Sequence, residues 1–161
     1  MEEVVALIGI DWADESHEMC ICEIGSNRVE HETVEQKAEI LHDWVSGLRR
    51  RFQGGKIAIA LEQSKGALIY GLMRYEFLLI YPLNPKSLSS YREALRTSGA
   101  KDDPSDAELI LNFLRTHRER LRVWVPEDEI SRRLGMLVEF RRKMVADLVR
   151  VTNRLRTLLK G

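Results

Sequence analysis

Several features that mark other protein classes are missing from this sequence. No apolar run approaches the roughly 20 residues of a membrane span, and two glutamates follow Met1 in place of the basic segment of a secretory signal. Cys20 and Cys22 are the only cysteines, so no disulfide framework forms and no further cysteine completes a zinc site, which leaves a metal role for the pair as a minor alternative. We therefore expect free, buried thiols in a cytoplasmic protein that does not associate with membranes.

The net charge is zero, but the charges are unevenly distributed along the chain. Residues 1–48 contain 12 acidic and two basic residues, whereas residues 49–161 contain 23 basic and 13 acidic ones. Nine Lys or Arg residues and two acids fall within 130–161. Such a basic half is typical of proteins that face nucleic acid, although a solvated basic helix produces the same pattern.

The order of the apolar patterns predicts an α/β domain with a mixed sheet. A nearly continuous apolar run predicts a buried first strand, and an antiparallel meander, a helix and a β-α-β unit follow. This is the element order of the ribonuclease H-like fold, in which the first and fourth strands lie side by side. The predicted strands are 4–11, 17–24, 28–34, 56–61, 77–81 and 123–125, and the predicted helices are 35–52, 66–75, 85–95 and 103–118.

The C-terminal segment predicts one long helix. We divide the chain into a domain at 1–126 and a basic amphipathic helix at 127–161. Apolar residues recur in this helix at alternating steps of four and three, which is the spacing of a coiled coil, and Arg141 interrupts them. The helix is therefore expected to pair with its equivalent in a second chain. The repeating residues are Ile130, Leu134, Leu137, Met144, Leu148, Val151, Leu155 and Leu158.

Four carboxylates follow buried strands or begin a predicted helix. Asp11 ends the first apolar strand, Glu62 ends the fourth, and Asp103 and Asp106 stand three residues apart around a helix start, with Asp103 as the expected N-cap. Each acid alone fits a turn or capping role better than a catalytic one. Together they predict a metal site, because clustered carboxylates repel one another unless cations neutralise them. Two Mg²⁺ or Mn²⁺ ions about 3.5–4 Å apart are the usual occupants.

Basic and aromatic residues near these acids are candidates for contact with nucleic acid. Trp12 follows Asp11 and could stack on a base, although tryptophans at strand ends are more often buried. The four histidines are dispersed without ligand spacing, and we assign them no chemistry. The candidate phosphate contacts are Lys65 and Lys101, beside the acids, and Arg142, Lys143, Arg150 and Arg154 on the C-terminal helix.

Four ordered motifs give the chain a resemblance to a known family. They are GIDWA at 9–13, LEQSKG at 61–66, YPLNP at 81–85 and SGAKDDPSDA at 98–107. In these motifs the chain resembles the RuvC-like N-terminal domain of DEDD transposases of insertion-sequence family 110.

The resemblance implies a function and a set of partners. The four family acids fall on Asp11, Glu62, Asp103 and Asp106, and the long helix resembles the family's dimeric coiled coil. The family carries out DNA transposition guided by a structured RNA, in the prokaryotic cytoplasm at the nucleoid. Its C-terminal domain carries a serine nucleophile, and we expect that domain to follow this segment.

Two other functions are consistent with parts of the sequence. The first is a non-catalytic module that binds nucleic acid and dimerises, with the acids holding one structural ion or none. The second is a sugar-kinase or actin-like ATPase, whose fold also opens with a strand ending in Asp. That fold needs a glycine-rich phosphate loop after the strand, and residues 14–17 (DESH) supply none.

Overall fold

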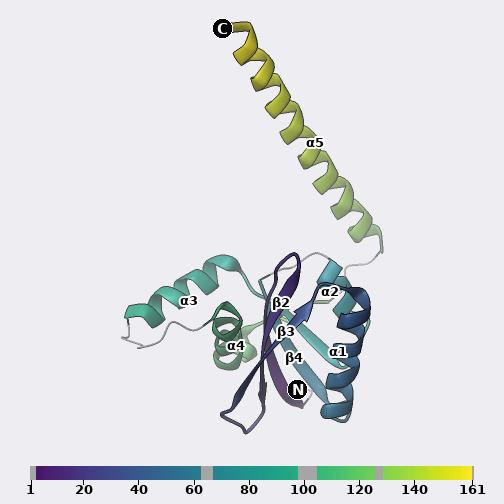
Figure 1. The fold of residues 1–161 in the computed structure, drawn as a ribbon, viewed down its shortest axis with the longest axis vertical. Helices are drawn as coiled ribbons and strands as arrows, with labels where there is room; N and C mark the ends of the chain where they lie inside the picture. The colour runs from purple at the N-terminus through teal and green to yellow at the C-terminus, as the bar shows by residue number, and fades with distance from the viewer. Residues whose placement is uncertain (1–2, 63–66, 98–104, 126–128, 161) are drawn as a thin grey trace. The chain divides into compact units, whose positions relative to one another are not determined.

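The structure is a computed structural model that describes residues 3–62, 67–97, 105–125 and 129–160. The chain divides into two compact units, Met1–Trp124 and Val125–Gly161, and each is described by itself. Figure 1 shows the first unit as a sheet with helices on both faces, and the described part of the second as one helix.

The described residues of the first unit form a five-stranded mixed sheet. Its strands are β1 (Val4–Asp11), β2 (Ser16–Glu23), β3 (Val29–Glu35), β4 (Lys56–Leu61) and β5 (Leu78–Pro82). They lie in the order β3-β2-β1-β4-β5. β1, β2 and β3 pair antiparallel, whereas β1, β4 and β5 pair parallel. The predicted α/β class with a mixed sheet is confirmed, and the arrangement is consistent with a ribonuclease H-like fold.

The helices of the first unit lie close to the predicted segments, with one change at the fourth. They are α1 (Ala38–Arg51), α2 (Ala67–Leu72), α3 (Pro85–Thr97) and α4 (Asp106–His117). The N-cap of α4 is Ser105, whose hydroxyl accepts a hydrogen bond from the Glu108 N–H at 3.3 Å. The prediction of Asp103 as the N-cap was therefore wrong, because the serine next to the helix satisfies that free amide.

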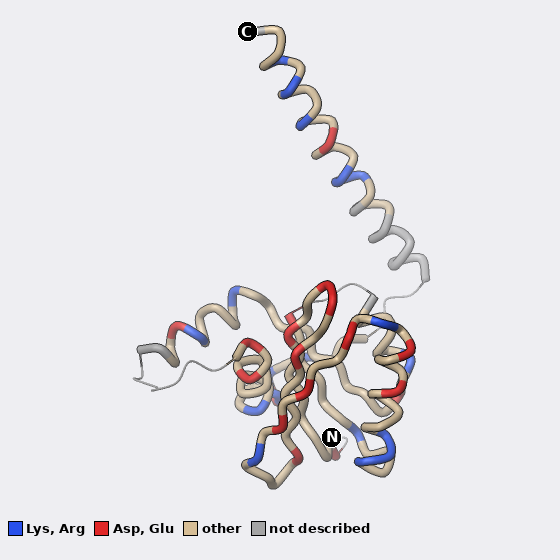
Figure 2. Tube along the Cα trace, viewed as in Figure 1, with Lys and Arg blue, Asp and Glu red and all other residues tan. Residues whose placement is uncertain are grey.

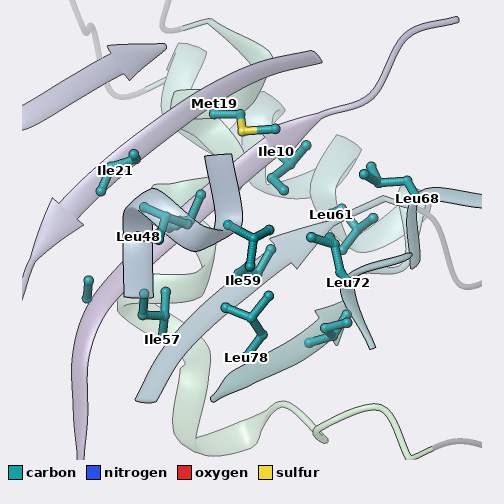
Figure 3. Close-up of a cluster of buried hydrophobic side chains, with 14 of the residues drawn as sticks. Ile10, Met19, Ile21, Leu48, Ile57, Ile59, Leu61, Leu68, Leu72 and Leu78 are labelled. Carbon is teal, nitrogen blue, oxygen red and sulfur yellow. The ribbon is translucent and has the colours of Figure 1, made fainter. Parts of the chain in front are cut away.

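Alternate side chains of the central strands enter two cores, one on each face of the sheet. Ile8 and Ile10 pack with α1 and α2 in the first core, which Figure 3 shows. Leu7 packs with α3 and α4 in the second core. On β4, Ile59 and Ala60 divide in the same way. From Leu7 onward, odd-numbered residues of β1 therefore face α4, as do even-numbered residues of β4.

α4 approaches β1 too closely at Gly9 for any side chain to fit there. A Cβ atom at this position would lie 2.3 Å from the Ala107 carbonyl oxygen and 2.5 Å from the Leu111 nitrogen. Both are backbone atoms of α4, so they cannot rotate away as the end of a side chain could. Gly9 thus allows the first turns of α4 to lie directly on the strand, where Ala107 and Leu111 are buried.

The end of the first unit lies beside β5 without forming a strand. The Trp124 N–H donates to the Ile80 carbonyl at 2.7 Å, and the Trp124 side chain packs partly buried against the first core. The prediction of a short strand at 123–125 was wrong, since these residues are not in a strand.

Charged residues separate along the described chain. Figure 2 shows acidic residues along β2 and β3, and mainly basic residues on the helix of the second unit. Arg51, at the end of α1, forms two hydrogen bonds of 2.7 and 2.8 Å with the Glu30 carboxylate on β3. Acidic side chains on β3 also protect this edge of the sheet from pairing with another strand.

The second unit consists of α5 (Glu129–Lys160), a helix of 32 residues. Many of its large apolar side chains are exposed. The structure contains one chain, so the pairing of this helix in a coiled coil stays a prediction. No described helix is long and apolar enough to cross a membrane. The exposed apolar residues include Leu137, Phe140, Met144, Leu148, Val151, Leu155 and Leu158.

The contact at Gly9 predicts the effect of a single methyl group. Gly9→Ala should reduce the free energy of unfolding by about 1–3 kcal/mol, the usual range when a packed core receives an extra methyl group. Gly47→Ala is the matched control, because a Cβ there meets nothing within 4 Å. Alanine inside α1 should instead stabilise by about 0.5–1 kcal/mol. Urea denaturation measures both changes. If Gly9→Ala leaves the free energy of unfolding unchanged, α4 can move away from β1 without loss of stability.

Candidate metal centre

Asp11 lies at the C-terminal end of β1, on the face covered by α4. Its position follows from the alternation along the strand, since Leu7, Gly9 and Asp11 share that face. The side chain is partly buried. Because β1 is central in the sheet and buried along most of its length, the backbone carrying this carboxylate is firmly held.

Asp106 is the first residue of α4 and lies near Asp11 because that helix packs on β1. The two carboxylates are close enough for the charge of Asp106 to act on Asp11. Asp106 remains largely exposed, and its place in the first turn favours a negative charge because of the helix dipole. The structure therefore brings together two of the four predicted acids.

The environment of Asp11 raises its pKa above the ordinary value of 3.8. Burial is the largest cause, and the negative charges of Asp106 and Glu18 act in the same direction. The positive charge of Arg92 acts in the opposite direction. Desolvation and neighbouring like charges both disfavour the ionised carboxylate, and a bound cation would offset this cost.

A cation from the protein already pairs with one of these acids. The Arg92 guanidinium on α3 donates from Nη2 to Oδ1 of Asp106 at 2.6 Å. Both side chains remain partly exposed, so the pair contributes little to stability. Nothing in the sequence pattern singled out Arg92, because its pairing depends on how α3 packs beside α4.

Glu62 follows β4 at the same edge of the sheet. The parallel register places Ile10 beside Leu61, so Asp11 and Glu62 come next on neighbouring strands. Glu62 is exposed, and it does not complete a group with Asp11 and Asp106. Across the part of the chain that the structure describes, no three His, Cys, Asp or Glu side chains lie close enough to hold a metal ion.

The remaining predicted residues near the acids lie outside the described ranges. These are Asp103, Lys65 and Lys101, whose roles stay predictions. Trp12, next to Asp11, is 38% exposed, so its ring is available for stacking. On α5, Arg142, Lys143, Arg150 and Arg154 are exposed, and Arg150 pairs with Asp147 at 3.2 Å.

His17 has a structural role that the sequence analysis did not assign. The ring is fully buried, its Nδ1 accepts a hydrogen bond from the Ala13 N–H at 3.3 Å, and its Nε2 contacts the Gln36 side-chain oxygen. Since Nδ1 must be an acceptor, Nε2 carries the proton. His17 thus fixes the turn that follows Asp11. Its alternation with Met19 and Ile21, which point into the first core, was the signal for its burial.

The two cysteines are free and buried, as predicted. The Cys20 thiol, near Ser105 at the start of α4, has its pKa raised to about 11, mainly by burial. It is therefore protonated at neutral pH and is a poor metal ligand or nucleophile.

Comparison with known proteins supports one family. A family model described as a transposase, of the DEDD type of insertion-sequence family 110, matches residues 8–161. A protein of Sinorhizobium fredii that is named as a transposase, y4uE, is 27% identical over 154 residues, covering 94% of this chain and 43% of its own length. A Streptomyces coelicolor protein named as the mini-circle transposase for IS117 is 27% identical over 168 residues, covering 99% and 39%. The chain thus spans about two fifths of the length of these curated relatives.

The raised pKa of Asp11 predicts a pH-dependent effect of its replacement. The folded chain binds this proton more readily than the unfolded chain, so ionised Asp11 reduces stability as pH rises from 3.8 through the raised pKa. Without metal, Asp11→Asn should melt at the same temperature as wild type or higher near pH 7, and this advantage should disappear towards pH 4.

Thermal melts in EDTA at both pH values measure this difference. Asp14→Asn, which removes an exposed carboxylate from the next turn, controls for the loss of one negative charge. A large loss of stability in Asp11→Asn near pH 7 would show instead that the ionised carboxylate makes a structural hydrogen bond.

Proposed function

The chain belongs to the DEDD transposases of insertion-sequence family 110, and from this premise we propose that it is the metal-binding catalytic domain of a DNA transposase. Asp11, Glu62, Asp103 and Asp106 would hold Mg²⁺ or Mn²⁺, with two ions when the site is full. The observation that supports this most directly is the approach of Asp106 to the buried end of β1, where Asp11 is desolvated beside a like charge. A ribonuclease H-like fold with catalytic acids at this sheet edge accounts for the same arrangement.

The donor set fits these ions in its chemistry. Carboxylate oxygens are the ligands that Mg²⁺ and Mn²⁺ prefer, and crowded carboxylates gain most from a cation. When bound, the ions stabilise the attacking and leaving oxygens of a phosphodiester. Asp11 contributes a ligand fixed by a central strand, and Asp106 one fixed by the first turn of α4. Exposed Glu62 is free to turn towards them, since it follows the strand.

The rest of the proposed reaction depends on parts beyond this segment. The relatives are more than twice as long as the matched region, which leaves room for the serine-bearing domain that the resemblance implies. In that case these acids would orient the scissile phosphate for attack by the serine, and a structured guide RNA would select the DNA. The protein would act on DNA in the prokaryotic cytoplasm, at the nucleoid.

α5 supplies a surface for self-association and another for phosphate. Its exposed apolar side chains would be covered by the same helix of a second chain, as in a coiled coil. Arg141 interrupts the apolar positions and would need to extend to the solvent. Arg142, Lys143, Arg150 and Arg154 would then flank the paired helices and contact DNA or RNA. Such contacts are independent of sequence and weaken steeply with salt.

One observation favours a second function, a non-catalytic module that binds nucleic acid and dimerises. Among the described residues no three potential ligands come together, and Asp106 is already neutralised by Arg92. In this case the acids would hold one structural ion or none. Loss of metal binding in Asp11→Asn would favour the catalytic domain, because that function requires divalent ions on Asp11.

Calorimetric titration with Mn²⁺ tests the metal site directly. Wild type should bind the ion, and Asp11→Asn should weaken binding by at least about tenfold, as expected for loss of a metal ligand. Asp14→Asn should bind as wild type does, since that exposed carboxylate is outside the centre. Equal binding by wild type and Asp11→Asn, or no binding by either, would favour the non-catalytic module.

Replacement of one apolar residue tests self-association through α5. Leu148→Asp should convert an associated chain to monomer, because a carboxylate would be buried between the helices without a partner. Asn153→Asp adds the same charge on the opposite side of the helix and should leave the mass unchanged. Light scattering over a range of concentrations measures both. A wild-type chain that stays monomeric at high concentration would contradict the pairing.

A further inference from the structure

We propose that Arg92 holds the place of the metal ion at Asp106, and that cation binding releases its guanidinium to contact a nucleic-acid phosphate. The inference rests on the proposed function, because it assumes that Asp106 binds a divalent cation. Arg92 would then have two mutually exclusive partners: the Asp106 carboxylate in the metal-free protein and a nucleic-acid phosphate when the metal is bound.

The packing of α3 on α4 positions Arg92 beside the acids, so the pair is not a chance contact between two surface side chains. α3 is anchored on α4 by Leu88, which is buried in the second core, and by Tyr91. The Tyr91 ring meets Phe113 edge-on, with ring centres 5.2 Å apart, and also contacts His117. The next residue, Arg92, reaches Asp106 at 2.6 Å, and its charge extends to Asp11.

A guanidinium and a divalent cation cannot both neutralise the same carboxylate without repelling each other. Mg²⁺ and Mn²⁺ need the oxygen lone pairs that the Arg92 N–H now occupies, and the like charges would lie within a few ångströms. The pair is partly exposed, with 38% and 53% of the two side chains accessible, so it is weak enough for an ion to displace. Arg92 should therefore reduce metal affinity modestly.

Once displaced, the guanidinium remains beside the site where the scissile phosphate must bind. Its planar fork matches phosphate oxygens, and an arginine keeps its charge at any physiological pH. Metal and nucleic acid would then assist each other, since the ion frees the arginine and the phosphate retains it. Thermodynamic linkage requires this coupling to be equal in both directions.

Calorimetry with Mn²⁺ tests the first half of the exchange. Arg92→Gln should bind Mn²⁺ about two- to fivefold more tightly than wild type, the range expected for removal of a weak competing ion pair. Arg51→Gln is the matched control, because it breaks an Arg–Glu pair of similar exposure that lies on α1 and β3. It should leave Mn²⁺ affinity unchanged, so the comparison separates local competition from a change of net charge.

Binding of a duplex DNA oligonucleotide, followed by fluorescence anisotropy, tests the second half. In EDTA, Arg92→Gln and Arg51→Gln should bind equally, since Arg92 is then engaged with Asp106. In saturating Mn²⁺, Arg92→Gln should bind about threefold more weakly than Arg51→Gln, or worse, through loss of a phosphate contact.

The outcomes separate this inference from the proposed function. If wild type binds no Mn²⁺, or if Asp11→Asn binds it equally well, the metal centre and the exchange are both overturned. If wild type binds Mn²⁺ and Asp11→Asn does not, while Arg92→Gln matches Arg51→Gln in both assays, the metal centre stands and the exchange alone is overturned.

Discussion

The contact between α4 and Gly9 is the constraint on which the candidate site depends. Because the strand has no side chain at this position, backbone atoms of the helix can lie where a Cβ would otherwise be, 2.3 Å from the Ala107 oxygen. The same contact closes the second core and sets the start of α4 next to the end of β1. The separation of Asp11 and Asp106 is therefore a consequence of core packing, and a change in the core would alter it.

Core packing of this kind brings like charges together, and the chain must neutralise them. Burial and the neighbouring acids raise the pKa of Asp11, while Arg92 pairs with Asp106. His17, buried and bonded to Ala13 and Gln36, holds the turn after Asp11. The candidate site thus consists of two crowded carboxylates, a fixed turn and one arginine counter-charge. Under the proposed function, this combination would leave the acids able to receive a metal ion.

Much of this protein was determined by its sequence alone. The continuous apolar runs in β1 and β4 and the alternation in β2 specify buried and half-buried strands, because side chains of a strand alternate between faces. Their order with the helices specifies a mixed sheet with β1 beside β4. From this order alone, Asp11 and Glu62 could be placed at one edge of the sheet, and the family motifs around them could be interpreted.

The tertiary structure decided what depends on contacts between distant segments. Ser105 caps α4 in place of Asp103, because the helix begins where it packs on β1. Trp124 bonds to the edge of β5 without extending into a strand. The close approach at Gly9 and the pairing of Arg92 with Asp106 join residues far apart in the chain, and no local pattern encodes them. Sequence patterns report which face of an element is buried, whereas the distances between functional groups are set only when those faces pack.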